Sequence, residues 1–181
     1  MKKAKYILFA ILVIASCTVS KEASTSGNEL RKEKNLAEQA MVREAIESKR
    51  FIVRFNRIYF RFGGMVDLVP RANFLIVDGD KAVISAAYIG RQHTFRPIAG
   101  ITMRGKTVKY EVKDIPSKGK FELDLKVNNH NDTFDIFMTV GENGSIQASM
   151  SSIRIDNVRY SGHIIPISEK RSNASEWKEL I

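Results

Sequence analysis

Residues 120–150 read KFELDLKVNNHNDTFDIFMTVGENGSIQASM, and their alternation of side chains sets the architecture expected for the chain. Apolar residues recur at every second position, and short Asn- and Gly-rich breaks interrupt the pattern. A period of two places apolar and polar side chains on opposite faces of a strand, and such breaks are typical of hairpin loops. The segment therefore predicts three consecutive antiparallel strands. Their apolar positions are Phe121, Leu123, Leu125, Val127, Phe134, Ile136, Met138, Val140, Ile146, Ala148 and Met150.

The same period extends outward in both directions. Strands are expected around 108–112 and 153–165, and earlier within 51–62, 66–68, 74–77 and 81–89. The alternation changes phase near Asn56-Arg57 without a loop signal, which predicts a bulge or tight bend. Asp78-Gly79-Asp80 is typical of a hairpin turn. About eight strands with no helix between them indicate a mainly β domain over 49–167, an antiparallel meander curled into a barrel or a sandwich.

One helix is expected in front of this domain, over residues 30–48. The segment contains no Gly or Pro and is rich in Leu, Ala, Glu, Lys and Arg. Ala37, Met41 and Ala45 form an apolar stripe, which Val42 and Ile46 widen, so the helix is expected to pack against the sheet. Residues 168–181 show little periodicity and are expected to form a C-terminal tail.

The N-terminus predicts export and lipid attachment. Three lysines precede a ten-residue apolar run, Tyr6 to Ala15, which is too short to span a bilayer as a helix. Ile14-Ala15-Ser16-Cys17 has the form of a bacterial lipobox, so residues 1–16 are expected to be a lipoprotein signal peptide and Cys17 the lipidated residue. Residues 17–29 would then be a flexible tether. The alternative is an ordinary signal peptide with an incidental cysteine.

This interpretation places the protein in the cell envelope, anchored to a membrane by its lipid and expected at the outer membrane. The formal net charge is +9, but the basic residues are spread along the chain rather than grouped beside aromatic residues. An exported protein with this distribution is not expected to bind nucleic acid. Attraction to anionic lipid or polysaccharide is an alternative to a simple solvated basic surface.

Four motifs resemble those of one protein family: FLIVDGD at 74–80, AYIGR at 87–91, the strand from Gly105 to Val112, and RYSG at 159–162. The family comprises uncharacterised bacterial envelope lipoproteins and is known only as a domain of unknown function. The resemblance covers roughly Ile46 to Ile167. It implies a β-rich envelope domain behind a lipid anchor, and it implies no catalytic residue and no substrate.

The segment from Tyr88 to Pro97 is the candidate binding site. It interleaves aromatic and cationic residues, which protein binding surfaces favour, and two arginines can grip a carboxylate or phosphate. The alternative is that Tyr88 and Phe95 belong to the core while the arginines lie at its rim. The candidate binding residues are Tyr88, Arg91, His93, Phe95 and Arg96.

No catalytic, metal or cofactor motif is found. His93, His130 and His163 lack partners at metal-ligand spacing, and the serines between 145 and 152 lack the marks of an activated nucleophile. Asp124, Asn128, Asn129, Asn131 and Asp132 resemble calcium ligands in type but lack the EF-hand order, so turn formation is the preferred interpretation.

The expected function is therefore non-enzymatic. The β-domain would bind an unknown small ligand or an envelope protein, and no cofactor is expected. A structural or accessory subunit of an envelope complex is the alternative, and a hydrolytic enzyme is the third.

Overall fold

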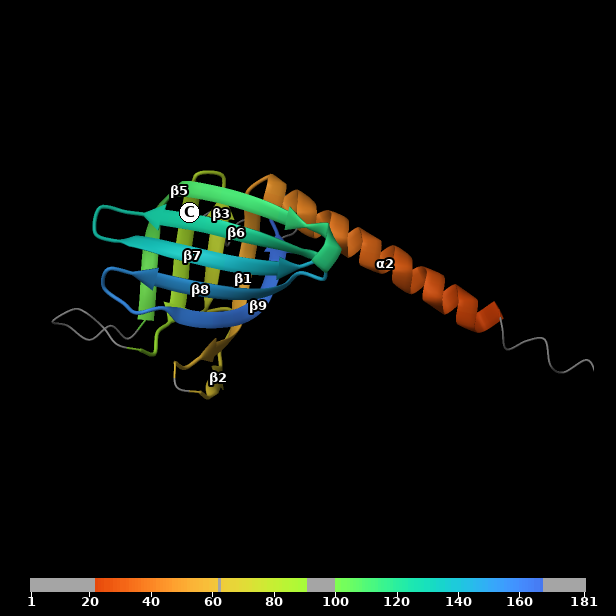
Figure 1. The fold of residues 1–181 in the computed structure, drawn as a ribbon, viewed down its shortest axis with the longest axis horizontal. Coiled ribbons are helices and arrows are strands. Elements are labelled where there is room, and N and C mark those ends of the chain that lie inside the picture. Colours follow the sequence, from red (N-terminus) through yellow and green to blue (C-terminus); the bar gives the residue numbers. More distant parts are fainter. Residues whose placement is uncertain (1–21, 62, 91–99, 168–181) are drawn as a thin grey trace, which may run out of the picture. The chain divides into compact units, whose positions relative to one another are not determined.

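The computed structural model describes residues 22–61, 63–90 and 100–167 of the chain (Figure 1). The chain divides into two compact units, residues 1–37 and 38–181. Helix α2, Glu22–Glu47, begins in the first unit and ends in the second. It starts at Glu22 rather than at Leu30, so the described backbone of 22–29 is helical where the sequence predicts a tether. Extending a helix adds a hydrogen bond per residue without repeating the cost of nucleation.

The predicted signal peptide, the first part of the predicted tether (residues 17–21, with Cys17) and the predicted C-terminal tail lie outside the described residues. The described part of the second unit is built on strands, as the period of two predicts. The strands are β1 (Arg50–Tyr59), β2 (Met65–Asp67), β3 (Phe74–Asp78), β4 (Lys81–Ala87), β5 (Gly100–Ile115), β6 (Lys120–Asn128), β7 (Thr133–Gly141), β8 (Ser145–Ser152) and β9 (Val158–Pro166). A short 3-10 helix, η2 (Pro116–Lys118), joins β5 to β6.

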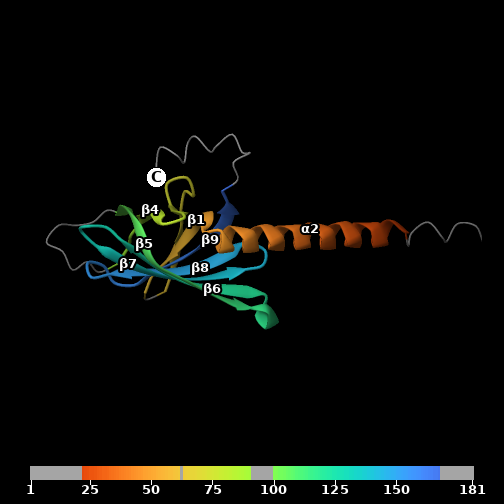
Figure 2. The same ribbon diagram turned by 90° about the horizontal axis from the view of Figure 1, so that it is seen from above.

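The sheet closes into an eight-stranded antiparallel barrel, one of the two predicted alternatives. The strand order is β2-β1-β3-β4-β5-β6-β7-β8-β9, and β9 returns to pair with β1. Strand β2 is an extra strand that pairs with the end of β1, from Arg57 to Tyr59. In Figure 1 the group β6, β7 and β8 crosses in front of β1, β3 and β4, and Figure 2 shows the same barrel from above.

The predicted irregularities of the sheet are present. The register of the β1–β9 ladder shifts between Phe55 and Arg57, which confirms the bulge expected near Asn56-Arg57. The β3–β4 hairpin turns at Gly79, which has a positive φ of 61°. A second bulge lies in β5 between Thr107 and Lys109. These bulges bend the strands that must curve to close the barrel.

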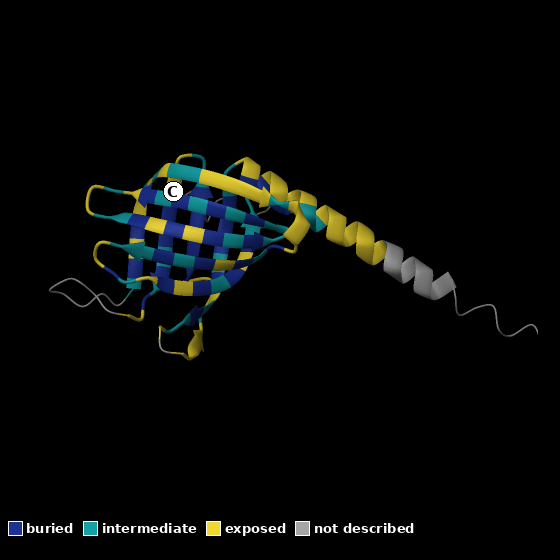
Figure 3. Ribbon diagram, viewed as in Figure 1, coloured by how far each residue is buried: buried dark blue, intermediate teal, exposed yellow. Residues whose placement is uncertain are grey.

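The interior of the barrel is filled by apolar side chains. Figure 3 shows buried positions alternating with intermediate or exposed ones along β6, β7 and β8. Phe55 and Tyr160 stack inside the barrel with ring centroids 4.7 Å apart, and both are essentially inaccessible to solvent. The Tyr160 hydroxyl donates a hydrogen bond of 2.7 Å to the carbonyl of Ala87, so the one polar atom of this large side chain is satisfied. The interior is therefore a packed core.

The last turns of α2 close one end of this core. Val42, Ala45 and Ile46 are buried in the main apolar cluster, whereas Met41 of the predicted stripe is 48% exposed. The Tyr110 hydroxyl of β5 donates a 2.6 Å hydrogen bond to the carbonyl of Ile46 at the helix end, which also accepts a hydrogen bond of 3.2 Å from the backbone N–H of Lys49. These contacts confirm that the end of the predicted helix packs on the sheet.

Candidate functional site

The predicted binding segment is only partly described. Tyr88 is 6% exposed and belongs to the main core cluster, as the core alternative predicted for it. Burial is the main cause that raises the pKa of its hydroxyl above the ordinary value. The remaining candidates, Arg91, His93, Phe95 and Arg96, lie outside the described residues.

The Asn- and Asp-rich loop between β6 and β7 is held together by its own hydrogen bonds. Asn129 Oδ1 accepts hydrogen bonds from the backbone N–H groups of Asn131 and Asp132, each at 2.9 Å. Asp132 accepts from the backbone of Thr133 at 2.8 Å and from the Ser152 hydroxyl at 3.0 Å. These side-chain oxygens stabilise a turn, which is the interpretation preferred in the sequence analysis over a calcium site. Across residues 22–61, 63–90 and 100–167, no three His, Cys, Asp or Glu side chains gather as metal ligands.

No hydrogen bond joins Ser145 to His130 or His163, all of which lie within the described range 100–167. Ser145 and His163 face each other across the β8–β9 ladder, but the Ser145 hydroxyl donates to Asn143 Oδ1 at 2.7 Å. His163 lies exposed on the outside of β9, and His130 is exposed in the β6–β7 loop. Asp78, in the hairpin between β3 and β4, forms an ion pair with Arg50 at 3.1 Å.

The outer face of the barrel carries a hollow that the sequence does not single out. Cross-strand pairing aligns Phe137, Ser149, Arg159 and Tyr59 in one outward-facing row over β7, β8, β9 and β1. We call the hollow of about 300 Å³ along this row the outer trough. Its outward-facing lining residues are Tyr59, Phe137, Thr139, Gln147, Ser149 and Arg159.

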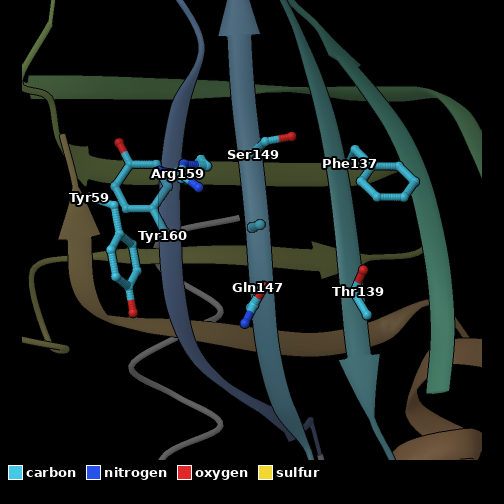
Figure 4. A pocket seen from close by; sticks show the side chains of 8 residues that line it. Tyr59, Phe137, Thr139, Gln147, Ser149, Arg159 and Tyr160 are labelled. Atoms are coloured by element: carbon cyan, nitrogen blue, oxygen red, sulfur yellow. The ribbon is translucent and has the colours of Figure 1, made fainter. Parts of the chain in front are cut away.

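The trough exists because a small side chain stands between large ones. Figure 4 shows Ser149 and Gln147 on the central strand, with Phe137 and Thr139 on one side and Arg159 and Tyr59 on the other. Neighbouring strands are about 4.8 Å apart, so the row from Phe137 to Tyr59 spans roughly 14 Å of surface. Phe137 is 48% exposed, although large apolar side chains are usually buried.

Tyr59 is fixed at its end of the trough. Its hydroxyl lies 3.2 Å from the Ser161 hydroxyl, which donates a further hydrogen bond to Asn56 Oδ1. The guanidinium of Arg159 lies 5.9 Å from the centre of the Tyr59 ring. The pKa of Tyr59 is lowered, first by the hydrogen bond with Ser161 and then by the positive charges of Arg57 and Arg159. Two arginines therefore lie at this end of the trough, and one of them, Arg57, is paired with Asp67 at 2.8 Å.

Two further hollows share lining residues with the trough. One, of about 480 Å³, shares Thr139 and Gln147 with it and reaches Lys118, Lys120 and His163. The other, of about 410 Å³, shares Tyr59 and Arg159 and reaches Arg61. Lys120 is paired with Glu122 at 2.6 Å and Arg61 with Asp156 at 3.6 Å. The two neighbouring hollows therefore contain basic residues, of which Lys120 and Arg61 are paired with acidic side chains.

The outward orientation of one trough residue, Phe137, can be predicted from the sequence. Phe137 occupies the polar phase of its strand, between Asp135 and Thr139, where a two-residue period predicts an outward side chain. Its alignment with Tyr59 and Arg159 depends on pairing among four strands, and the sequence alone does not give that register.

Within the described part of the chain, no helix combines the length and the apolar character needed to cross a membrane.

Comparisons with known proteins identify the family. The model of a family described as a domain of unknown function, DUF4251, matches residues 33–164. A crystal structure of a DUF4251 family protein from Bacteroides eggerthii is similar in fold, with a TM-score of 0.64 and 16% sequence identity over 78% of this chain and 94% of that chain. No curated protein matches the chain. Because the family model covers more than half of the sequence, the chain belongs to the DUF4251 family of domains of unknown function.

Proposed function

We propose that this protein is a lipid-anchored component of the bacterial cell envelope whose β-barrel binds a ligand non-covalently through the outer trough. The lipobox ending at Cys17 supports the anchor, and the trough supports binding. The observation that carries the binding role is the half-exposed ring of Phe137, aligned with Ser149, Arg159 and Tyr59 on the outside of the closed barrel.

The position of the trough favours binding outside the barrel rather than within it. The inward positions of β1 and β6 to β9 are occupied by buried apolar side chains that form one cluster. The trough instead combines an apolar ring with hydroxyl, amide and guanidinium groups, the mixture typical of a site that orients a ligand. Its side chains stand on regular strands, which hold a site more rigidly than loops do.

A photo-crosslinking amino acid in place of Gln147 tests the binding role. Gln147 is exposed in the middle of the trough, and Ile153, which is 81% exposed in the β8–β9 loop, is the matched control position. In intact envelopes we expect a discrete adduct from position 147 that disappears when Phe137→Ala is added. The same adduct from both positions, or none from position 147, contradicts the binding role.

Replacing Cys17 with Ala tests the anchor separately. We expect the Cys17→Ala variant to lose incorporation of labelled fatty acid and to leave the membrane fraction, because acyl chains supply the membrane affinity. Undiminished labelling and sedimentation with membranes contradict the anchor.

The edge of β5 supports a second candidate function, that of an accessory subunit in an envelope complex. Strand β4 pairs with β5 only from Gly100 to Lys106, so among the described strands residues 109–115 of β5 pair with β6 alone. Val108 and Val112 are 60% and 41% exposed there. A partner strand adding to this edge would be captured by a crosslinker at Lys113, and its absence from such adducts contradicts this candidate.

A further inference from the structure

We propose that the outer trough binds a carboxylated oligosaccharide, such as a uronic-acid segment of an acidic polysaccharide. The inference rests on the ligand-binding role proposed above and names the chemical class of the ligand.

The backbone around the trough excludes an extended peptide that adds as a strand. The trough lies in the middle of the barrel wall, where β8 pairs with β7 on one side and with β9 on the other. Backbone groups paired in this way have no free row of donors and acceptors to offer a further strand. A ligand must therefore bind to side chains, not to a sheet edge.

The floor of the trough suits a polyhydroxylated ligand. Ser149 and Thr139 present hydroxyl groups and Gln147 an amide, and each of these groups both donates and accepts hydrogen bonds. Sugar hydroxyl groups need partners of both kinds. An aliphatic chain lying here would leave these polar groups without water or partners, which is unfavourable.

The two aromatic rings at the sides of the floor suit the apolar C–H face of a sugar ring. A pyranose ring has a face of C–H groups, and burying that face against an aromatic ring removes apolar surface from water. Phe137 offers such a ring on β7 and Tyr59 another on β1, with only Ser149 and Arg159 between them in the row. A chain of sugars is long enough to contact both rings, because they are separated by roughly three strand spacings.

The charge of the trough selects an acidic sugar. Arg159 is exposed and lies against the Tyr59 ring, whereas neighbouring Arg57 is paired with Asp67 at 2.8 Å. A guanidinium held by an aromatic ring keeps its planar donors available, and these match the two oxygens of a carboxylate. The basic side chains of the two neighbouring hollows, and a formal net charge that is +9 for the full chain and 9 − 3 = +6 without Lys2, Lys3 and Lys5 of the predicted signal peptide, attract a polyanion from a distance.

Affinity electrophoresis of the full chain tests the proposal. The gels contain polygalacturonate, neutral pullulan or dextran sulfate, and retardation gives the dissociation constant. We expect polygalacturonate to bind more tightly than the other two polymers. Phe137→Ala and Arg159→Gln should each weaken polygalacturonate binding about tenfold, the loss expected for one stacking or charge-assisted contact. Phe137→Trp keeps an aromatic ring and should therefore retain polygalacturonate binding. Ser149→Trp should abolish that binding by filling the hollow.

Matched control variants lie away from the trough. Ile153→Ala removes an exposed apolar side chain, and Arg104→Gln removes an exposed cation from β5. Both should leave polygalacturonate binding unchanged. Equal binding of dextran sulfate, with Arg104→Gln as harmful as Arg159→Gln and Phe137→Ala without effect, overturns the proposal in favour of general charge attraction. Equal binding of pullulan overturns the choice of an acidic sugar.

The failure of this proposal is distinguishable from failure of the binding role. Absence of polygalacturonate binding, together with a Phe137-dependent adduct from the crosslinker at Gln147, overturns the carbohydrate class and leaves the trough as a binding site. Absence of both overturns the trough as well.

Discussion

Replacing Gly162 with Ala tests how the barrel closes. Gly162 lies opposite Phe55 in the β1–β9 ladder, beside the bulge between Phe55 and Arg57. A Cβ atom added at Gly162 would overlap the carbonyl oxygen of Arg54 and lie 3.0 Å from the Cα of Phe55. Both are backbone atoms, so only a separation of β1 from β9 relieves the overlap.

We expect Gly162→Ala to lower the free energy of unfolding by about 3 kcal/mol. Overpacking costs about 1–3 kcal/mol, and each ladder hydrogen bond weakened by the separation contributes about 1 kcal/mol. The smaller conformational freedom of Ala in the unfolded chain offsets about 0.5 kcal/mol. For a domain of this size, the loss corresponds to a Tm lower by about 6–12 °C.

Urea unfolding followed by far-UV circular dichroism measures this loss. Gly63→Ala is the control, because a Cβ there meets no atom within 4 Å and the cost arises only from the positive φ of 95°. That cost is about 1–2 kcal/mol. A free energy of unfolding for Gly162→Ala within about 0.5 kcal/mol of the unsubstituted protein would refute the closure described here.

Three further predictions concern buried polar groups. Tyr160→Phe should lose about 1 kcal/mol of unfolding free energy with its 2.7 Å hydrogen bond to Ala87, measured by urea unfolding. Burial raises the pKa of the Tyr160 and Tyr110 hydroxyl groups, so the folded state favours their neutral forms. Their contribution to the free energy of unfolding is therefore fully present below about pH 10, the ordinary pKa of tyrosine in the unfolded chain, and decreases as the pH rises above it. The decrease in unfolding free energy above about pH 10 should be smaller in Tyr160→Phe than in the unsubstituted protein. An equal decrease contradicts the assignment of part of it to Tyr160. Asn73→Ala should cost about 2 kcal/mol, because Asn73 is 7% exposed and its amide joins Val69 and Ala87 by hydrogen bonds of 2.9 and 2.7 Å; a loss below about 0.5 kcal/mol contradicts this role.

The local features of the fold were predictable because they depend on neighbours in sequence. The two-residue period locates the strands of the hairpins after residue 120, and the phase change at Asn56-Arg57 locates the bulge in β1. The choice between barrel and sandwich depends on β1 meeting β9, which follows about a hundred residues later. Strand periodicity determines which face is apolar but not which distant strand is the partner.

For the helix, too, the sequence predicts an apolar face but not how the helix is rotated against the sheet. Its apolar stripe correctly includes Val42, Ala45 and Ile46, but Met41 remains 48% exposed. The stripe is wide enough to allow several rotations of the helix against the sheet. The hydrogen bond from Tyr110 to Ile46 and the ion pair of Arg43 with Asp114 at 2.6 Å accompany the rotation that is adopted.

The outer trough was not predictable as a site for a related reason. An outward Phe137 is visible in the sequence, but its neighbours in space come from β8, β9 and β1. For Tyr88 the sequence left a binding surface and a core position open, because an aromatic residue in a polar segment is compatible with both. Only the closed barrel places Tyr88 in the core cluster.

Mapping amide chemical-shift changes on titration with galacturonic-acid oligosaccharides tests the central claim, binding of an acidic oligosaccharide at the outer trough, most directly. We expect saturable changes concentrated at Phe137, Gln147, Ser149, Arg159 and Tyr59, with little change at inward positions such as Leu125. Changes centred on the barrel interior or on α2, or no saturable change, would contradict it.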